Sequence, residues 1–241
     1  GNPAVNHRGY REFGEVMVEV VEIRERILYE DRDIVVCHKP AGLAVQSAKI
    51  GQMDLESGLK NELAARQGEG GPDLGVVHRL DQPVEGLVVF AKSQKAAANL
   101  NSQIAKRMVD KTYLAVVREV KTPSAGRLED WLKRDGRKNL STVVAPNTFG
   151  SKKAVLEYEI LARNGGKMLA QICLLTGRHH QIRVQMAHRG MPLLGDQKYG
   201  PQQERGQLGL CASELRFRHP SSNRDISFRI QPEGEAFRCF Y

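Results

Sequence analysis

The sequence lacks the features that mark membrane-spanning, secreted and repetitive proteins. Its 241 residues contain no run close to the roughly 20 apolar residues that a membrane helix needs, so no membrane segment is expected. The polar residues 1–15 lack the apolar core of a signal peptide and are expected to form a frayed leader. No internal repeat stands out, and the 41% hydrophobic content is typical of a chain with an ordinary core. We therefore expect a soluble globular protein.

Cysteine is scarce, and no two cysteines form a CxxC pair. The four cysteines are Cys37, Cys173, Cys211 and Cys239. This spacing argues against a disulfide framework and against the usual zinc patterns. Histidine is present seven times, but no HExxH motif occurs, and His179 and His180 are adjacent. We expect no metal and no cofactor, and a reducing, cytoplasmic location.

The net charge is the first feature of the sequence that suggests a binding partner. Lys and Arg number 36 against 28 Asp and Glu, a net charge of +8. Eight of these cations against three acids lie in residues 121–153, around Trp131, with no helical period. A basic, aperiodic stretch favours an extended arm that binds phosphates, although a merely basic enzyme is the alternative. The arm's candidate RNA contacts are Lys133, Arg134, Arg137 and Lys138.

The remaining pattern predicts the fold class. Residues 16–23 are rich in β-branched side chains, and hairpins are expected for 27–39 and for 155–175, the latter turning at Asn164-Gly165. Helices are expected over 54–66, over 94–108 after a Ser93 cap, and over 178–190. Strands in hairpins with few helices predict an α+β fold, a mixed, mainly antiparallel β-sheet with flanking helices. We expect an N-terminal extension, residues 1–25, and one catalytic domain, residues 26–241.

The segment HRLDQPVEG, residues 78–86, places Asp81 in a loop between two apolar strands. A rigidly held loop is a common place for functional side chains. A carboxylate there can be a nucleophile, a general base or a metal ligand. Equally, Asp81 can cap a turn or pair with Arg79.

Two further segments carry candidate residues. TGRHHQIR places Arg178 at a strand-to-helix junction and Arg183 five residues later. A guanidinium can hold a carboxylate in a two-pronged pair, although Arg183 alone also fits a surface charge on a helix. KTY, residues 111–113, places Tyr113 in an apolar strand, where it can pack or stack on an unpaired base.

Together these segments resemble the RluA-type pseudouridine synthase family. The resemblance covers roughly residues 26–232, through ILYEDRDIVVCHKPAGLAV, HRLDQPVEGLVVFAK, KTYLAVV, TGRHHQIRV and PLLGDQKYG in the right order. It implies a pseudouridine synthase fold with a central RNA-binding cleft. It also implies an isomerase that converts uridine to pseudouridine in RNA by base flipping, with neither cofactor nor metal.

The resemblance also assigns residues. Asp81 matches the catalytic aspartate, Tyr113 the tyrosine that packs on the target base, and Arg183 the arginine paired with the aspartate. Arg79 matches an arginine that fills the space left by the flipped base. Lys111 and Arg178 are further RNA-binding candidates, and Lys39, Pro40, His78 and Gly86 are candidates for structural support of the active-site wall.

Three routes for the catalytic aspartate stay open. Asp81 can attack the ribose C1′, add to C6 of the ring, or remove the 2′ proton. The chain before Ile27 is too short for an S4 RNA-binding module, so the catalytic domain is expected to hold the substrate. A monomer acting on tRNA, ribosomal RNA or both is expected.

One departure from the family pattern concerns the catalytic loop. Val84 and Glu85 replace the usual Thr-Ser pair. We expect Glu85 to point to solvent or to pair with an arginine, because a second carboxylate beside Asp81 would disturb its ionisation. The alternative function is a catalytically decayed RNA-binding or assembly factor on the same fold.

Overall fold

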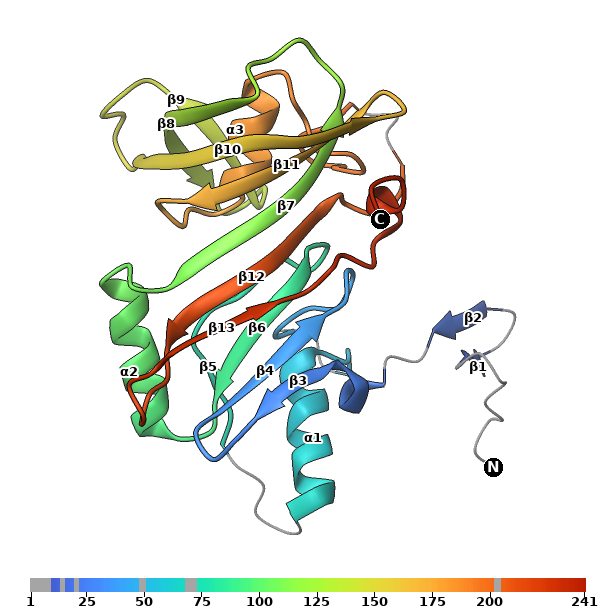
Figure 1. Ribbon diagram of the computed structural model, residues 1–241, viewed down its shortest axis with the longest axis vertical. Helices are drawn as coiled ribbons and strands as arrows, with labels where there is room; N and C mark the ends of the chain where they lie inside the picture. The colour runs from blue at the N-terminus through green and yellow to red at the C-terminus, as the bar shows by residue number, and fades with distance from the viewer. Residues whose placement is uncertain (1–9, 14–15, 20–21, 48–50, 68–72, 202–204) are drawn as a thin grey trace.

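A computed structural model describes residues 10–13, 16–19, 22–47, 51–67, 73–201 and 205–241 (Figure 1). The strands are β1 (Tyr10–Phe13), β2 (Val16–Glu19), β3 (Ile27–Glu30), β4 (Ile34–Lys39), β5 (Gly75–Val76), β6 (Glu85–Ala91), β7 (Asp110–Arg118), β8 (Ala125–Asp135), β9 (Leu140–Val144), β10 (Lys152–Asn164), β11 (Lys167–Leu174), β12 (Leu210–Arg218) and β13 (Asp225–Arg229). The helices are α1 (Leu55–Gln67), α2 (Gln94–Ala105) and α3 (Gln181–His188), with 3₁₀ turns η1 (Ile23–Arg26) and η2 (Glu235–Phe237).

One large sheet organises the molecule. Its path runs β3-β4-β6-β12-β7-β11-β10-β8-β9, with β13 paired to β12 and β5 paired to β6. All of these pairs are antiparallel except β6 with β12. This confirms the expected α+β fold with a mixed, mainly antiparallel sheet.

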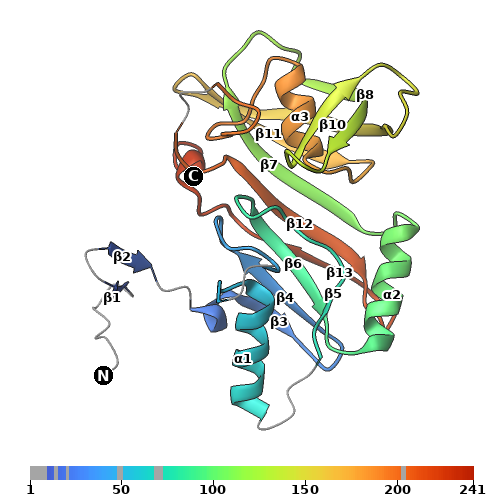
Figure 2. The ribbon, with the colours of Figure 1, turned by 180° about the vertical axis from the view of Figure 1, so that it is seen from behind.

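The paired strands β7 and β12 lie between the two halves of the sheet, as both ribbon views show (Figures 1 and 2). Helices α1 and α3 lie on the same side of the sheet (Figure 2) and contribute to the same large core. In α1, Leu55, Leu59 and Leu63 are fully buried, because a four-residue spacing places them on one helix face. The sheet is therefore fixed by a core on the side where the helices α1 and α3 lie.

Four local predictions need correction. β2 ends at Glu19 and η1 follows from Ile23, so the expected strand over 16–23 is too long; residues 20–21 lie outside the described part. The β10–β11 turn is Gly165-Gly166, both with positive φ, because β10 continues to Asn164. Helix α3 begins only at Gln181. Helix α2 is capped by Ser93 as expected but ends at Ala105.

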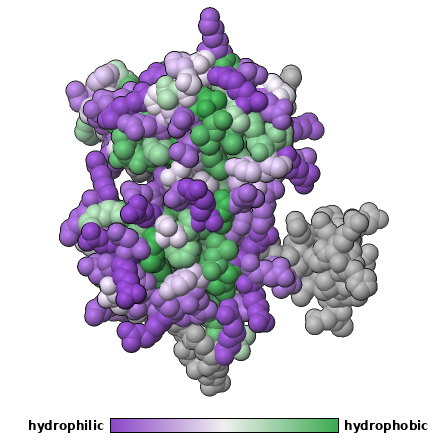
Figure 3. Space-filling view, viewed as in Figure 1, coloured by the Kyte–Doolittle hydropathy of each residue, from purple (hydrophilic) through white to green (hydrophobic). Residues whose placement is uncertain are grey.

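The N-terminal leader also differs from the expectation. β1 and β2 form a two-stranded sheet of their own, although a frayed segment was expected over 1–15. Residues 1–9 and 14–15 lie outside the described part. Within the described residues, no helix is long and apolar enough to cross a membrane. The face seen in Figure 3 is mostly polar, with apolar patches over both halves.

Candidate active site

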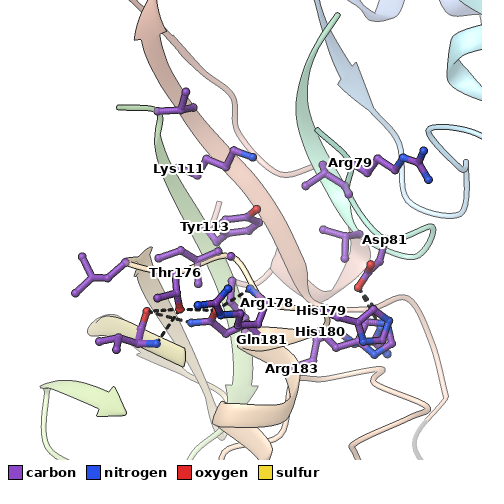
Figure 4. Close-up of a pocket in the computed structure, with 18 of the residues that line it drawn as sticks. Arg79, Asp81, Lys111, Tyr113, Thr176, Arg178, His179, His180, Gln181 and Arg183 are labelled. Atoms are coloured by element: carbon purple, nitrogen blue, oxygen red, sulfur yellow. Dashed lines mark hydrogen bonds and ion pairs between the residues drawn. The ribbon is translucent and has the colours of Figure 1, made fainter. Parts of the chain in front are cut away.

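Asp81 lies in the loop between β5 and β6, near the middle of the main sheet (Figure 4). The buried side chains of Leu80 and Val84 anchor this loop on either side of Asp81, and the Val84 N–H donates to the Asp81 carbonyl at 2.9 Å. The Asp81 side chain keeps 36% of its surface exposed. The loop therefore presents a carboxylate from a fixed backbone.

The Lys39 side chain binds backbone carbonyls of this loop and of the neighbouring turn. Its Nζ donates to the carbonyl oxygens of Pro40, Leu43 and Gln82 at 3.0, 2.7 and 3.1 Å. Burial lowers the pKa of Lys39 to about 7, against the opposing effect of the Asp81 and Glu85 charges. Since Gln82 follows Asp81 directly, Lys39 joins the Pro40 turn to the loop that carries Asp81.

Arg183 of α3 approaches Asp81 from the other half of the sheet. Its Nη1 lies 3.6 Å from Asp81 Oδ2. Its Nε and Nη2 donate to Asp196 at 2.8 and 2.7 Å. Burial acts to raise the pKa of Asp196, but the hydrogen bond and charge of Arg183 outweigh it and hold that pKa below its ordinary value. Arg183 is only 4% exposed, so it is not a surface charge on its helix.

A histidine also faces Asp81. His180 Nε2 lies 3.4 Å from Asp81 Oδ2, and Figure 4 shows the two side chains meeting. His180 is buried, directly precedes α3 and has a left-handed backbone conformation, with φ of 54°. Its ring contacts that of His179, with centroids 3.7 Å apart. Two nitrogens, from His180 and Arg183, thus converge on one oxygen of Asp81.

Tyr113 and Lys111 point from β7 toward the same space (Figure 4). Tyr113 is buried, and burial together with the charge of Asp81 raises the pKa of its hydroxyl. Lys111 Nζ lies 3.1 Å from His78 Nδ1, and His78 Nε2 accepts the Val89 N–H at 3.1 Å. Burial lowers the pKa of Lys111 to about 8.

These side chains line two adjoining clefts. The first, of about 1150 Å³, includes Tyr113, Lys111 and Arg178. The second, of about 1110 Å³, includes Arg134 and Pro40. The residues shared by both are Arg79, Asp81, His179, His180 and Arg183. Asp81 therefore stands where the two clefts meet, and the space beside it is large enough for a nucleotide.

The sequence profile of the RNA pseudouridylate synthase family matches residues 33–188, more than half of the chain. The chain belongs to the RNA pseudouridylate synthase family.

Curated members of this family are similar over most of the chain. The uncharacterized RNA pseudouridine synthase YlyB of Bacillus subtilis is 35% identical over 92% of the chain and 73% of its own length. Ribosomal large subunit pseudouridine synthase D is 37% identical in Neisseria meningitidis and 39% identical in Pseudomonas aeruginosa, over 84% and 78% of the chain. The chain spans 56% of the length of each synthase D. These relatives confirm the predicted RluA-type family and the predicted enzyme class, isomerases acting on uridine in RNA.

Solved structures share the pseudouridine synthase fold. Human RNA pseudouridylate synthase domain containing 4 superposes with a TM-score of 0.73 at 24% identity, covering 88% of this chain and 90% of that one. Human RNA pseudouridylate synthase domain containing 1 gives a TM-score of 0.71 at 22% identity, covering 89% and 86%. The expected pseudouridine synthase fold is therefore confirmed.

Within this pseudouridylate synthase fold, the basic candidates separate into two groups. Arg79, Lys111, Arg134 and Arg178 line the clefts. Lys133, Arg137 and Lys138 are exposed around the turn between β8 and β9 and line neither cleft. The expected arm is thus a β-hairpin continued by β10, and only part of it reaches the site.

Glu85 corrects a sequence expectation. It is 2% exposed, so it does not point to solvent, and its partners among the described residues include no arginine. Its carboxylate lies 2.8 Å from His38 Nε2 and accepts the backbone N–H groups of Glu233 and Gly234 at 2.7 and 3.0 Å. Glu85 therefore joins the C-terminal segment to β6 and does not converge on Asp81.

Gly86 shows why this strand needs glycine next to Glu85. Its φ is +140°, and an added Cβ would lie 2.5 Å from the backbone nitrogen of Ala212. The cause is the parallel pairing of β6 with β12, which sets Gly86 directly against Ala212. A side chain at this position would push the two strands apart, so Gly86 supports the loop that carries Asp81.

Three residues of the candidate site were not predicted from the sequence: Asp196, Tyr199 and His180. Asp196 and Tyr199 lie in GDQKYG, and His180 lies in TGRHHQIR, so the segments were singled out but these residues received no role. Two clusters of possible metal-ligating side chains also occur among the described residues, Asp31-Asp33-His219 and His38-Glu85-Glu233. Neither contains Asp81, and in both the histidine already contacts a carboxylate.

Proposed function

We propose that this chain is an RNA pseudouridine synthase that isomerises specific uridines of ribosomal RNA, with Asp81 as its catalytic group. The observation that carries the proposal is the Asp81 carboxylate itself, partly exposed where two clefts meet and faced on one oxygen by His180 and Arg183. The names of the synthase D relatives support a ribosomal RNA substrate, and tRNA is the alternative.

The reaction needs no atom beyond those of the uridine and water. The N1–C1′ bond breaks, the uracil turns, and C5 bonds to C1′; C5 then loses a proton, and N1 takes one up. Nothing is oxidised or reduced. An anionic Asp81 can attack C1′, add to C6 or remove the 2′ proton, and each route uses a carboxylate oxygen that is free to approach the nucleotide.

The target base must leave its helix to reach Asp81, at a cost of a few kcal/mol. The first cleft fits the flipped base, because the buried Tyr113 offers a ring to stack on and Val84 and Ile182 add apolar surface. Arg79 is exposed at the junction of the clefts, where its guanidinium can occupy the place the base has left.

Basic side chains on both sides of Asp81 can bind phosphates of the RNA strand. Arg178 and Lys111 line one cleft and Arg134 lines the other, while Lys133, Arg137 and Lys138 extend the basic surface outward. Each phosphate so neutralised releases counterions, so binding weakens steeply with salt.

The test is release of tritium from RNA labelled at uracil C5. Wild type is compared with Asp81→Asn, which keeps the size of the side chain, on transcripts of large-subunit ribosomal RNA and on tRNA. We expect release from ribosomal RNA by wild type alone, with RNA binding retained in the variant. Binding without release from either RNA by wild type would favour the decayed RNA-binding factor.

A further inference from the structure

The two nitrogens that face Asp81 contact the same oxygen. His180 Nε2 and Arg183 Nη1 lie 3.4 and 3.6 Å from Oδ2. In the described part of the chain, neither a hydrogen bond nor an ion pair engages Oδ1. An aspartate held by one oxygen presents the other oxygen in a defined direction. His180 can hold Oδ2 in this way only if its Nε2 carries the ring proton.

Tyr199 determines which ring nitrogen of His180 carries that proton. The Tyr199 hydroxyl oxygen accepts the backbone N–H of Ser141 at 2.8 Å. The same hydroxyl lies 2.7 Å from His180 Nδ1. A phenol has one proton to donate, and Nδ1 is the acceptor within reach among the described residues. An Nδ1–H would leave the Tyr199 hydroxyl proton without an acceptor among the described residues, so we assign the hydroxyl as the donor and Nδ1 as the unprotonated nitrogen.

The opposite end of the ring requires the same tautomer. Nε2 faces a carboxylate, which only accepts hydrogen bonds when ionised, so Nε2 carries the proton. Double protonation is disfavoured, because burial and the nearby charges of Arg183, His179 and Lys198 lower the pKa of His180 to about 3, with Asp196 acting in the opposite direction. In this tautomer the hydrogen bonds run from Ser141 to Tyr199 and from Tyr199 to His180, and the Nε2–H of His180 faces Asp81 Oδ2 at 3.4 Å.

We propose that His180 is a positioning residue for Asp81: Tyr199 fixes it as the Nε2–H tautomer, its N–H donates to Oδ2, and Oδ1 is left to react. This rests on the proposed function of Asp81. The buried setting strengthens the effect, because a ring held in place loses little entropy when the nucleotide enters.

Tyr199→Phe is the sharpest test. It removes one hydroxyl and keeps the ring, over which the Arg183 guanidinium lies at 5.3 Å. Without the donor, the Nδ1–H tautomer becomes accessible and sets a lone pair against Asp81. We expect kcat to fall roughly tenfold with KM nearly unchanged, the size expected for a lost hydrogen bond. His180→Gln, which can still donate an N–H, should retain more activity than His180→Ala.

His188→Gln is the matched control. His188 is exposed at the last residue of α3 and lines neither cleft. This variant should keep kcat within about twofold of wild type. Thermal unfolding of each variant shows whether a lost rate reflects a lost fold.

A second measurement is independent of activity. Nitrogen-15 NMR of ring-labelled histidine reports which nitrogen of His180 is protonated in the free protein. We expect the proton on Nε2 in wild type and a mixture of tautomers in Tyr199→Phe. A proton on Nδ1 in wild type, or Tyr199→Phe and His180→Ala variants that fold and retain full kcat, would overturn the proposal. Inactive wild type with the Nε2–H tautomer would contradict the proposed function alone.

Discussion

Arg183 is held by Asp196 through two hydrogen bonds of 2.8 and 2.7 Å, and its remaining nitrogen faces Asp81. Asp196 is completely buried, so it fixes the orientation of the Arg183 guanidinium before any substrate binds. The arginine that approaches the Asp81 carboxylate is thus itself positioned by a second carboxylate, 13 residues further along the chain.

Asp196→Asn should destabilise the fold and lower activity. Removing one partner of a buried ion pair costs about 3–5 kcal/mol, although the amide retains part of the hydrogen bonding. Urea unfolding checks the loss of stability, and kcat measured on the folded fraction checks the orientation of Arg183. Asp225, whose exposed carboxylate pairs with Arg218 at 3.5 Å, is the matched control, and Asp225→Asn should change little.

The same pair predicts an acid dependence of stability. The pKa of Asp196 lies below its ordinary value of 3.8 in the folded state, so the contribution is complete above that value and is lost as the pH falls through the folded pKa. We expect wild type to lose stability below about pH 4 and Asp196→Asn to lose less over that interval. Equal acid slopes in the two proteins would contradict this assignment.

Lys39→Met should loosen the loop that carries Asp81. The variant leaves the carbonyls of Pro40, Leu43 and Gln82 without their donor, at roughly 2–4 kcal/mol in total. In wild type the folded pKa of Lys39, about 7, is below the ordinary 10.5, so the unfolded chain binds more protons between these values. The Lys39 contribution therefore makes stability rise with pH across that window, and the rise should be absent in Lys39→Met.

Glu85 is expected to support the fold and to take no part in catalysis. Glu85→Ala removes the acceptor for His38 and for two backbone N–H groups and should cost about 2–4 kcal/mol. Glu85→Gln keeps an oxygen for the backbone and should be milder. Folded Glu85→Gln should have nearly the kcat of wild type, and a large loss of kcat without a loss of stability would show that Glu85 acts on the chemistry.

We expect RNA binding to weaken as the pH rises from 7 to 9, because Lys111 loses its charge. Its pKa of about 8 means that its positive charge in the first cleft disappears as the pH rises from 7 to 9. We expect RNA affinity to fall several-fold over this range, as for the loss of one phosphate contact. Lys111→Arg stays charged and should lack this fall; fluorescence anisotropy at constant salt measures both. An identical pH dependence in the two proteins would count against Lys111.

Much of the fold could be predicted from local pattern. The four-residue spacing of Leu55, Leu59 and Leu63 indicated α1, and turn residues between two apolar runs indicated the hairpins of β3–β4 and β10–β11. Such periodicities work because they report which face of an element is buried. They place element ends poorly, as α3 and the Gly165-Gly166 turn show, because an end depends on backbone hydrogen bonds and not on burial.

The candidate site also has some features that the sequence predicts and others that depend on tertiary structure. The sequence by itself determined the family and predicted Asp81, Tyr113 and Arg183 as candidate site residues, because a motif consists of particular residue types in a particular order. The partners of these residues were decided by tertiary structure. Glu85 turned inward because the backbone N–H of Gly234, 149 positions away, lies beside it as a donor.

His180 is the clearest case. Its sequence neighbours do not reveal that Tyr199 sits at one ring nitrogen and Asp81 at the other. A buried polar group takes whichever donor or acceptor the packing brings within hydrogen-bond distance, and leaving it unpaired is costly. Residue types were therefore readable from the chain, whereas the direction of each hydrogen bond depended on how β6, α3 and the loop carrying Tyr199 come together.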